Sequence, residues 1–291
     1  MPPGLERCAD RGRAQRRAED ASATKAPRRS PVGADTGRVP DPDQLLDEAE
    51  TTGFEGWDFT SLGTRLVLEP PSWAFEDNVA ALAARSTTML DMGTGGGEWL
   101  SSLSRRGTLT VATESWPPNV GVAAARLRAL RIPVVQAEGA ADNHRQDHED
   151  PRGRLPFRTD AFDLVTNRHE SFVASEMARV LCPAGTFITQ QAHSGSRQFH
   201  ELLGVESPQL DEFELALALE QLDLAGLTVD EALEGDATTV FGDIGALAWC
   251  LRSVPWAVPG FAISAYRSAL LRLGAGPIRV TAKRFVIQAH K

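Results

Sequence analysis

Residues 89–100 read MLDMGTGGGEWL, and this stretch decides the fold. An apolar run, Met89–Met92, precedes four glycines within 93–97, and an amphipathic run begins at Glu98. The order indicates a buried strand, a tight loop and a helix. Glycines in such a loop let the backbone approach a ligand, and the free N–H groups at the start of a helix point outward. The stretch therefore predicts a binding loop for a small molecule.

Strands and helices alternate around this loop. The apolar runs predict seven strands, over residues 87–92, 109–113, 132–137, 161–167, 185–191, 227–234 and 283–290. Helical patterns separate most of them, over residues 98–106, 119–130, 175–181 and 209–226. This alternation is typical of a doubly wound α/β fold, in which helices cover both faces of a mostly parallel sheet.

Further helices are expected at both ends of this core. Helices over 41–50 and 72–85 precede the first strand, with Asp41 and Ser72 as their predicted N-caps. A helical cap segment, about 242–278, is inserted before the last strand and holds Trp249, Trp256 and Phe261. Such an insertion suits a lid over a binding site. Its aromatic residues fit either a core or a pocket.

The loop chemistry favours S-adenosyl-L-methionine (SAM) over a dinucleotide. A dinucleotide motif has glycine where Glu98 stands, and a carboxylate there would repel a pyrophosphate. Asp91, ahead of the first glycine, suits a cationic ligand, and SAM carries an ammonium group, a sulfonium and no phosphate. Glu114, 21 positions after Gly93, is placed to accept hydrogen bonds from ribose hydroxyls. Trp116 offers a flat face for adenine.

Four segments in order resemble the class I SAM-dependent methyltransferases, of the methyltransferase type 11 kind. MLDMGTGGGE resembles the first motif of the family, and VATESWPPNV resembles its acidic second-strand end. LPFRTDAFDLVTNRHE resembles the approach to the fourth strand, and MARVLCPAGTFITQQ resembles the turn before the fifth. Together they cover residues 87–191. The segments GWDF, PSW and DIGALAWCLRSVPWAVPGF resemble a bacterial branch of the family.

The resemblance implies a Rossmann-like, seven-stranded, mostly parallel sheet with an antiparallel last strand. It also implies methyl transfer from SAM and a set of cofactor-binding residues, namely Asp91, Gly93, Thr94, Gly95, Gly97, Glu114, Ser115, Glu138 and Asn167. Glu138 would face the adenine amino group, with Asp142 as its alternative because a long insert follows, and Asn167 would line the sulfonium side. Ala184 stands where the family has glycine, and we expect that turn to survive.

His169 is the candidate catalytic residue. It follows the fourth expected strand, and histidine titrates near neutral pH, so it suits removal of a proton from the acceptor. Capping of the next helix is the alternative role. His193 and Gln190–Gln191, at the end of the fifth strand, are favoured as packing residues of the turn, with a binding role as the alternative. His144 and His148 have the spacing of a metal pair, but they lie in a polar segment with helix breakers, so no metal is expected.

Charge and cysteine content restrict the partners and the compartment. Residues 1–40 hold 9 of the 30 Lys and Arg residues and 5 of the 39 Asp and Glu residues, which leaves 41–291 with a balance of −13. So negative a surface disfavours a nucleic-acid acceptor. Three cysteines without a CxxC pair indicate a reducing cytoplasm. No apolar run approaches the roughly 20 residues that span a bilayer, so no membrane association is expected.

We therefore expect a cytoplasmic methyltransferase domain over 41–291 that acts on a small-molecule acceptor. Residues 1–40, rich in Arg and Pro, are predicted to be a disordered tail. A nucleic-acid or membrane arm, or sequence upstream of the true start, are the other interpretations of that tail. An rRNA or tRNA methyltransferase and a non-catalytic SAM-binding protein are the alternative functions. The acceptor atom and the oligomeric state stay open.

Overall fold

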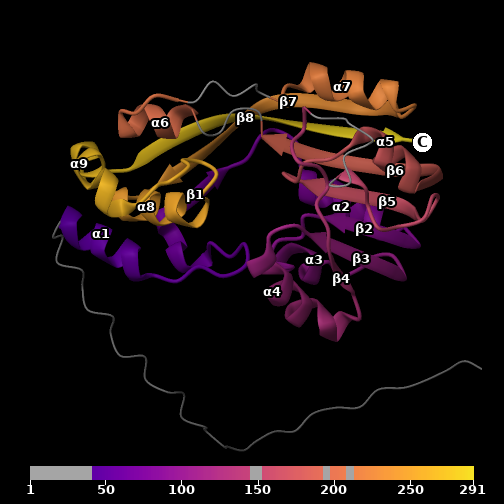
Figure 1. Ribbon diagram of the computed structural model, residues 1–291, viewed down its shortest axis with the longest axis horizontal. Coiled ribbons are helices and arrows are strands. Elements are labelled where there is room, and N and C mark those ends of the chain that lie inside the picture. Colours follow the sequence, from indigo (N-terminus) through magenta and orange to yellow (C-terminus); the bar gives the residue numbers. More distant parts are fainter. Residues whose placement is uncertain (1–40, 145–152, 193–196, 208–212) are drawn as a thin grey trace, which may run out of the picture. The chain divides into compact units, whose positions relative to one another are not determined.

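The computed structural model describes residues 41–144, 153–192, 197–207 and 213–291 (Figure 1). The described chain from Asp41 onward belongs to one compact unit, Val39–Lys291. The tail predicted over 1–40 lies outside the described residues, as do His148 and His193. No helix within the described ranges is both long enough and apolar enough to cross a membrane.

A single mixed sheet forms the centre of the fold, with the strand order β1-β7-β8-β6-β5-β2-β3-β4. Strands β6, β5, β2, β3 and β4 pair in parallel and follow one another down the right of Figure 1. The chain order changes direction at β2, which has β5 on one side and β3 on the other, and ligands of such sheets bind at that point. The bounds are β1 Leu66–Glu69, β2 Thr88–Met92, β3 Leu109–Glu114, β4 Val134–Gln136, β5 Phe162–Arg168, β6 Leu181–Ala192, β7 Thr228–Phe241 and β8 Ile278–His290.

The expected doubly wound, mostly parallel architecture and the antiparallel last strand are confirmed, since β8 runs antiparallel to both β6 and β7. The prediction of seven strands is wrong, because β1 is an eighth, antiparallel to β7 at the sheet edge. This four-residue strand is largely exposed and ends before two prolines, so it has no alternating burial to reveal it. β7 ends well after its expected end at residue 234, and β8 begins well before its expected start at residue 283. The two strands are longer than expected because they pair with each other from Thr228 to Phe241.

Most helices follow the expected pattern with shifted ends, and the helix over Arg197–Leu203 was not expected. Asp41 caps the first helix as predicted, since its carboxylate accepts a bond from the Asp43 N–H at 3.1 Å. The predicted cap Ser72 is wrong, because α2 begins only at Phe75 and Ala74 takes the cap position. The bounds are α1 Pro42–Thr51, α2 Phe75–Ala83, α3 Glu98–Ser102, α4 Pro117–Leu127, α5 Ala174–Val180, α6 Arg197–Leu203, α7 Leu215–Leu224, α8 Ile244–Ser253 and α9 Ile263–Leu273, with 3₁₀ turns at Thr60–Arg65 and Arg128–Leu130.

The turn that carries Ala184 lies inside β6 and keeps its expected shape. Ala184 has a φ of 61°, in the left-handed region that favours glycine, and its N–H donates to the Lys291 carbonyl at 3.0 Å. A non-glycine residue there costs about 1 kcal/mol of backbone strain. The family glycine is therefore replaced without loss of the turn.

Side-chain alternation along the central strands divides the core into two faces. Leu90, Val165 and Phe187 lie on one face, in a cluster with residues of α5 and α7. Their direct neighbours Met89, Leu164 and Ile188 lie on the other face, in a cluster with residues of α2, α3 and α4. All six are at most 1% exposed. Side chains along these strands alternate between the two faces of the sheet, and both faces are buried. This is expected when helices cover a sheet on both sides.

A third hydrophobic cluster packs α1 against the inserted helices α8 and α9. It includes Leu46 of α1, Trp249 of α8 and Leu270 of α9, and it continues onto Phe241, where β7 ends. Figure 1 shows these helices together at the left, where the β7–β8 ribbon extends away from the parallel strands. The inserted helices therefore have a core of their own.

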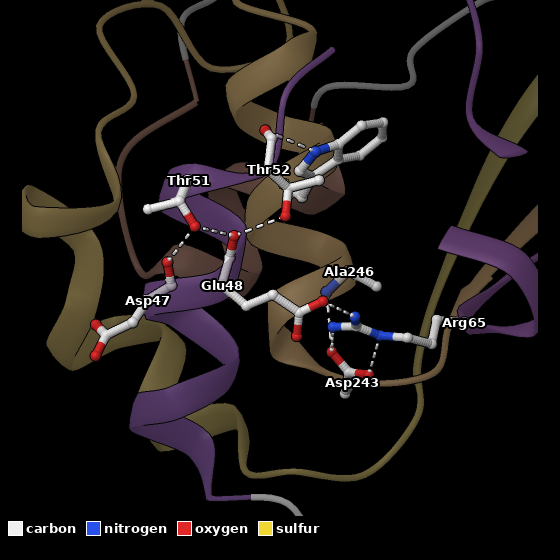
Figure 2. A network of polar contacts seen from close by, with 8 residues as sticks. Asp47, Glu48, Thr51, Thr52, Arg65, Asp243 and Ala246 are labelled. Carbon is white, nitrogen blue, oxygen red and sulfur yellow. Dashed lines mark hydrogen bonds and ion pairs between the residues drawn. The ribbon is translucent and has the colours of Figure 1, made fainter. Parts of the chain in front are cut away.

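A polar network holds α1 to α8 (Figure 2). Asp243 caps α8 by accepting from the Ala246 N–H at 2.9 Å, and its two oxygens accept from the Arg65 guanidinium at 2.7 and 2.8 Å. Arg65 also reaches Glu48 of α1 at 2.9 Å. Burial raises the pKa of Asp243, but the hydrogen bonds from Arg65 and from the Ala246 N–H, together with the Arg65 charge, lower it below its usual value. Asp243 therefore serves as a helix cap and as a charge partner at once.

We predict that Asp243→Ala lowers the free energy of unfolding by about 2–3 kcal/mol, because it removes a cap and leaves the half-buried Arg65 with only the exposed Glu48 as its charge partner. Urea denaturation measures the change. Arg279→Ala is the matched control, since its ion pair with Glu69 is exposed on both sides and should contribute less than about 1 kcal/mol. Equal effects of the two variants would contradict the central place of Asp243.

Candidate functional site

The loop between β2 and α3 is a glycine turn with three left-handed residues. Gly93, Gly95 and Gly97 have φ values of 64°, 64° and 78°, a region that glycine adopts without strain. A Cβ at Gly93 would lie 2.7 Å from the Cβ of Glu170, and one at Gly97 would lie 2.9 Å from the Leu127 side chain. The backbone conformation and the lack of room for a Cβ therefore both require glycine at these positions. The sequence analysis expected glycine here so that the backbone can approach a ligand.

Glu114 joins this loop to the end of the neighbouring strand. Its Oε2 accepts from the Gly95 N–H at 2.6 Å, and its Oε1 accepts from the Trp116 N–H at 2.8 Å. The residue is only 4% exposed, and burial raises the pKa of Glu114 although these N–H groups oppose the rise. The carboxylate thus lies at the carboxyl ends of β2 and β3, next to Ser115.

Asp91 lies beneath the loop, at the end of β2. Its Oδ1 accepts from the Thr166 hydroxyl at 2.7 Å, and burial raises the pKa of Asp91 to about 6. Thr94, in the loop, has a buried hydroxyl whose interaction with Asp91 opposes part of this rise. A buried carboxyl with a raised pKa beside the glycine turn gains from a polar ligand.

Asn167 brings a free donor to the end of β5. Its Oδ1 accepts from the Gln191 side-chain amide at 2.9 Å and from the Thr189 hydroxyl at 3.3 Å. Its Nδ2 is buried and has no hydrogen-bond partner among the described residues. An orphaned buried N–H costs about 1–3 kcal/mol, so this amide is suited to meet a ligand atom.

Glu170 enters the same site and was not among the predicted cofactor residues. Its Oε2 accepts from the Ser115 hydroxyl and its Oε1 from the Gly139 N–H, both at 3.4 Å. Burial is the main cause that raises the pKa of Glu170 to about 7, and the charges of Glu114 and Glu138 add to it. The side chain thus joins the ends of three strands, β2, β3 and β4. Its position after β5 was the only signal in the sequence.

The residues after β4 complete the group. Glu138 is exposed and lies near enough to Glu170 to raise its pKa, whereas the Asp142 carboxylate accepts from the His144 N–H at 2.9 Å. The structure therefore brings Glu138 toward the predicted site and ties Asp142 into a local turn. Within the described ranges, no three His, Cys, Asp or Glu side chains gather as metal ligands.

His169 stands at the opposite side of the strand ends, with a strained backbone φ of 66°. The Arg284 Nη1 lies 2.7 Å from His169 Nε2, and the Gln190 amide nitrogen lies at 3.4 Å. Desolvation and the charges of Arg284 and Arg168 lower the pKa of His169 well below its usual value. Neutral His169 is thus favoured.

Aromatic residues cover the glycine loop from one side. A cavity of about 430 Å³ lies between residues 54–57, the start of α4 and the segment that joins α8 to α9. Its walls include Trp57, Trp116 and Trp256, which are 43%, 47% and 56% exposed. Trp57 and Trp256 stack at 5.8 Å with an interplanar angle of 7°. Exposed aromatic walls of this size are typical of a ligand site.

The cap aromatics divide between core and cavity. Trp249 is 1% exposed and belongs to the helical core, whereas Trp256 faces the cavity and Phe261 stacks on Tyr266 at 5.3 Å. Trp57 is fixed on the loop itself, since a Cβ at Gly95 would lie 3.0 Å from the Trp57 Cβ. The N-terminal segment and the cap therefore meet directly over the glycine turn.

Comparison with known proteins identifies the central part of the chain. Residues 90–189 match the family model described as "Methyltransferase domain". A solved structure from Bacillus halodurans, named as a candidate methyltransferase, is 17% identical with a TM-score of 0.52, over 74% of this chain and 96% of that chain. The YcgJ protein of Bacillus subtilis is 15% identical with a TM-score of 0.48, over 74% and 97%. No curated protein matches the chain.

We predict that Glu170→Gln stabilises the protein at high pH. The folded state raises the pKa of Glu170 to about 7, so its contribution to stability is present below its ordinary pKa and is lost as the pH rises through 7. The variant should exceed the native protein by about 1–3 kcal/mol at about pH 8 and match it at about pH 4. Urea denaturation at both pH values measures this.

Glu234→Gln is the control for that measurement. Its ion pair with Lys283 is at the surface, and no large dependence on pH is expected from its loss. A Glu170→Gln protein that is less stable than the native one at about pH 8 would contradict a strained, buried carboxylate.

Proposed function

We propose that this chain, a SAM-dependent methyltransferase with a class I methyltransferase domain, transfers its methyl group to a small-molecule acceptor. The main observation that supports a small-molecule acceptor is the aromatic cover over the glycine turn. Trp57 from the N-terminal segment and Trp256 from the cap stack there and leave a cavity of about 430 Å³. That volume is on the scale of small-molecule sites.

The domain match confirms the family and the cofactor that the motifs predicted. SAM fits the residues present, because the site combines a glycine cradle, buried carboxylates and an orphaned amide donor. Two positive charges on the cofactor, an ammonium and a sulfonium, are favoured near the carboxylates of Asp91 and Glu114. When bound, SAM supplies an activated methyl group on its sulfonium.

Each cofactor residue has a proposed role that its position supports. The turn with Gly93, Thr94, Gly95 and Gly97 shapes the methionine pocket, above Asp91. Glu114 and Ser115 hold the ribose, and the exposed half of Trp116 packs on the adenine. Glu138 faces the adenine amino group from the end of β4. Asn167 directs its free Nδ2 toward the cofactor from the end of β5.

Glu170 is added to this set. Its carboxylate lies against Gly93 and the Ser115 hydroxyl, between the residues assigned to the methionine and to the ribose. A cation in the site favours the ionised carboxylate, because an opposite charge lowers the pKa of an acid. Binding of SAM therefore offsets the unfavourable burial of Glu170.

The catalytic role of His169 stays a prediction. Its Nε2 lies against the Arg284 guanidinium, which can only donate, so Nε2 accepts and the neutral ring carries its proton on Nδ1. The ring must give up this bond with Arg284 before Nε2 can take a proton from an acceptor. Much of the rate enhancement then comes from holding acceptor and cofactor in line.

An acidic surface and the absence of a basic patch beyond residues 1–40 support a small acceptor over RNA. The same composition, with three cysteines and no CxxC pair, supports a cytoplasmic enzyme. RNA methylation guided by the Arg-rich segment 1–40 is the alternative, and one experiment separates the two.

We predict that Glu114→Ala weakens SAM binding at least tenfold, because it removes a buried charged acceptor of about 1.5–3 kcal/mol. Isothermal titration with SAM, S-adenosylhomocysteine and NAD measures affinity, and circular dichroism checks folding. The native protein should bind the first two and not NAD. Glu234→Ala, at an exposed ion pair, should bind like the native protein. Unchanged affinity in Glu114→Ala would contradict the ribose assignment.

We predict that a chain without residues 1–40 keeps its methyl transfer to small molecules. Radiolabelled SAM is supplied with either a small-molecule extract or total RNA, and label is counted in each fraction. Label should enter the small-molecule fraction equally with the full and the shortened chain. Label in RNA that disappears on shortening would instead support the RNA alternative, since a basic arm supplies much of nucleic-acid affinity.

A further inference from the structure

Two arginines meet where β5 and β6 end. Arg168 is the last residue of β5 and lies opposite Gln190 of β6, and Arg284 of β8 lies opposite Ala192 at the end of β6. Their side chains come close enough that the charge of Arg168 lowers the pKa of Arg284, after desolvation as the main cause. Two guanidinium groups therefore lie close together where β5, β6 and β8 meet, next to Gln190.

Arg284 lacks a compensating negative charge. Its Nη1 donates to the neutral His169 ring, and its Nε is buried without a hydrogen-bond partner in the described part of the chain. No carboxylate in the described residues forms an ion pair with it, although surface arginines nearby, such as Arg279, have one. An uncompensated, desolvated guanidinium costs several kcal/mol, and an anion would remove that cost.

Arg168 contributes a second positive charge at small expense to the fold. Its only described ion pair is with Glu76 at 2.8 Å, in which the two side chains are 40% and 59% exposed. Exposed pairs of this kind are worth about 1 kcal/mol or less, so the guanidinium is free to turn to a ligand.

A chain of hydrogen bonds orients the group. The Trp73 indole N–H donates to Gln190 Oε1 at 2.8 Å, which leaves the Gln190 amide nitrogen facing His169. His169 adopts its left-handed backbone conformation at this point, although the residue is not glycine. Strain of about 1–3 kcal/mol that is kept in this way is typical of functional positions. His169 is thus a positioning residue for Arg284.

We propose that Arg284 and Arg168 bind an oxyanion of the methyl acceptor, either a carboxylate or a phosphate. This inference rests on the proposed function, because it assigns the chemical class of the acceptor. Arg168 follows Asn167 at the end of β5, and Arg284 lies two strands away on β8. The geometry points to the acceptor because both arginines lie on the opposite side of β2 from the ribose acid Glu114 of β3. Arginine is the side chain best suited to bind either oxyanion.

Binding of acetate and of inorganic phosphate, at constant ionic strength and without SAM, tests the proposal. Melting temperature is measured against anion concentration, with chloride as the reference salt. The native protein should show a saturable rise with at least one of the two anions, since a ligand of the folded state stabilises it. The anion that raises the melting temperature indicates whether the acceptor carries a carboxylate or a phosphate. Arg284→Met should bind it about tenfold more weakly.

Arg279→Met is the matched control, because it removes an arginine from the same strand at an exposed ion pair. It should keep the native response. If Arg284→Met does not fold, the ring signals of His169 in the unaltered protein, assigned with His169→Gln, provide a second measurement. They should shift on addition of the active anion and saturate with the same affinity.

Three results would overturn the proposal. The first is the absence of a saturable response to either anion in the native protein, and the second is an equal response in Arg284→Met. The third is a response that disappears when S-adenosylhomocysteine saturates the cofactor site, which would assign the arginines to the carboxylate of the cofactor itself. None of these measurements needs turnover. A failure of this proposal can therefore be distinguished from a failure to detect methyl transfer.

Discussion

The buried Glu114 carboxylate is the contact on which the site depends. It accepts one N–H from the glycine turn after β2 and one from the segment after β3, so a single side chain ties the turn to the end of the neighbouring strand. The same glycine turn packs against Trp57 at Gly95 and against Glu170 at Gly93. The glycine turn therefore positions both Trp57, which covers the site, and Glu170, which lies within it. Glu114 in turn holds the glycine turn.

Charges of both signs lie at the strand ends. Carboxylates with raised pKa values, Asp91, Glu114 and Glu170, gather toward β2 and β3, and the guanidinium groups of Arg168 and Arg284 lie on β5 and β8. Each set is unfavourable by itself, because burial disfavours charge. A cationic cofactor on one side and an anionic acceptor on the other would relieve both. Stability given up at a site for its ligand is a common property of enzymes.

Much of the fold and half of the site were predictable from local patterns. The glycine turn, Asp91, Glu114 and Asn167 each lie within or directly after a strand, and the carboxyl ends of parallel strands meet at one edge. β1 was missed because four exposed residues have no periodic burial. Glu170, whose sequence position suggested either orientation of the substrate or a pair with Arg168, was not predicted as a cofactor residue. Its place in the site depends on Gly93, Ser115 and Gly139, which three different strand ends bring together.

The sequence by itself determined the fold class, and it predicted the cofactor and the glycine loop proposed to bind it, since these depend on short-range periodicity and spacing. Only the tertiary structure decided the partners of Arg284 and the stack of Trp57 on Trp256, which come from segments 115 and about 200 residues apart along the chain. Such contacts follow from how β8 and the cap return to the sheet. Burial and charge compensation are properties of that packing and have no signature in the order of residues.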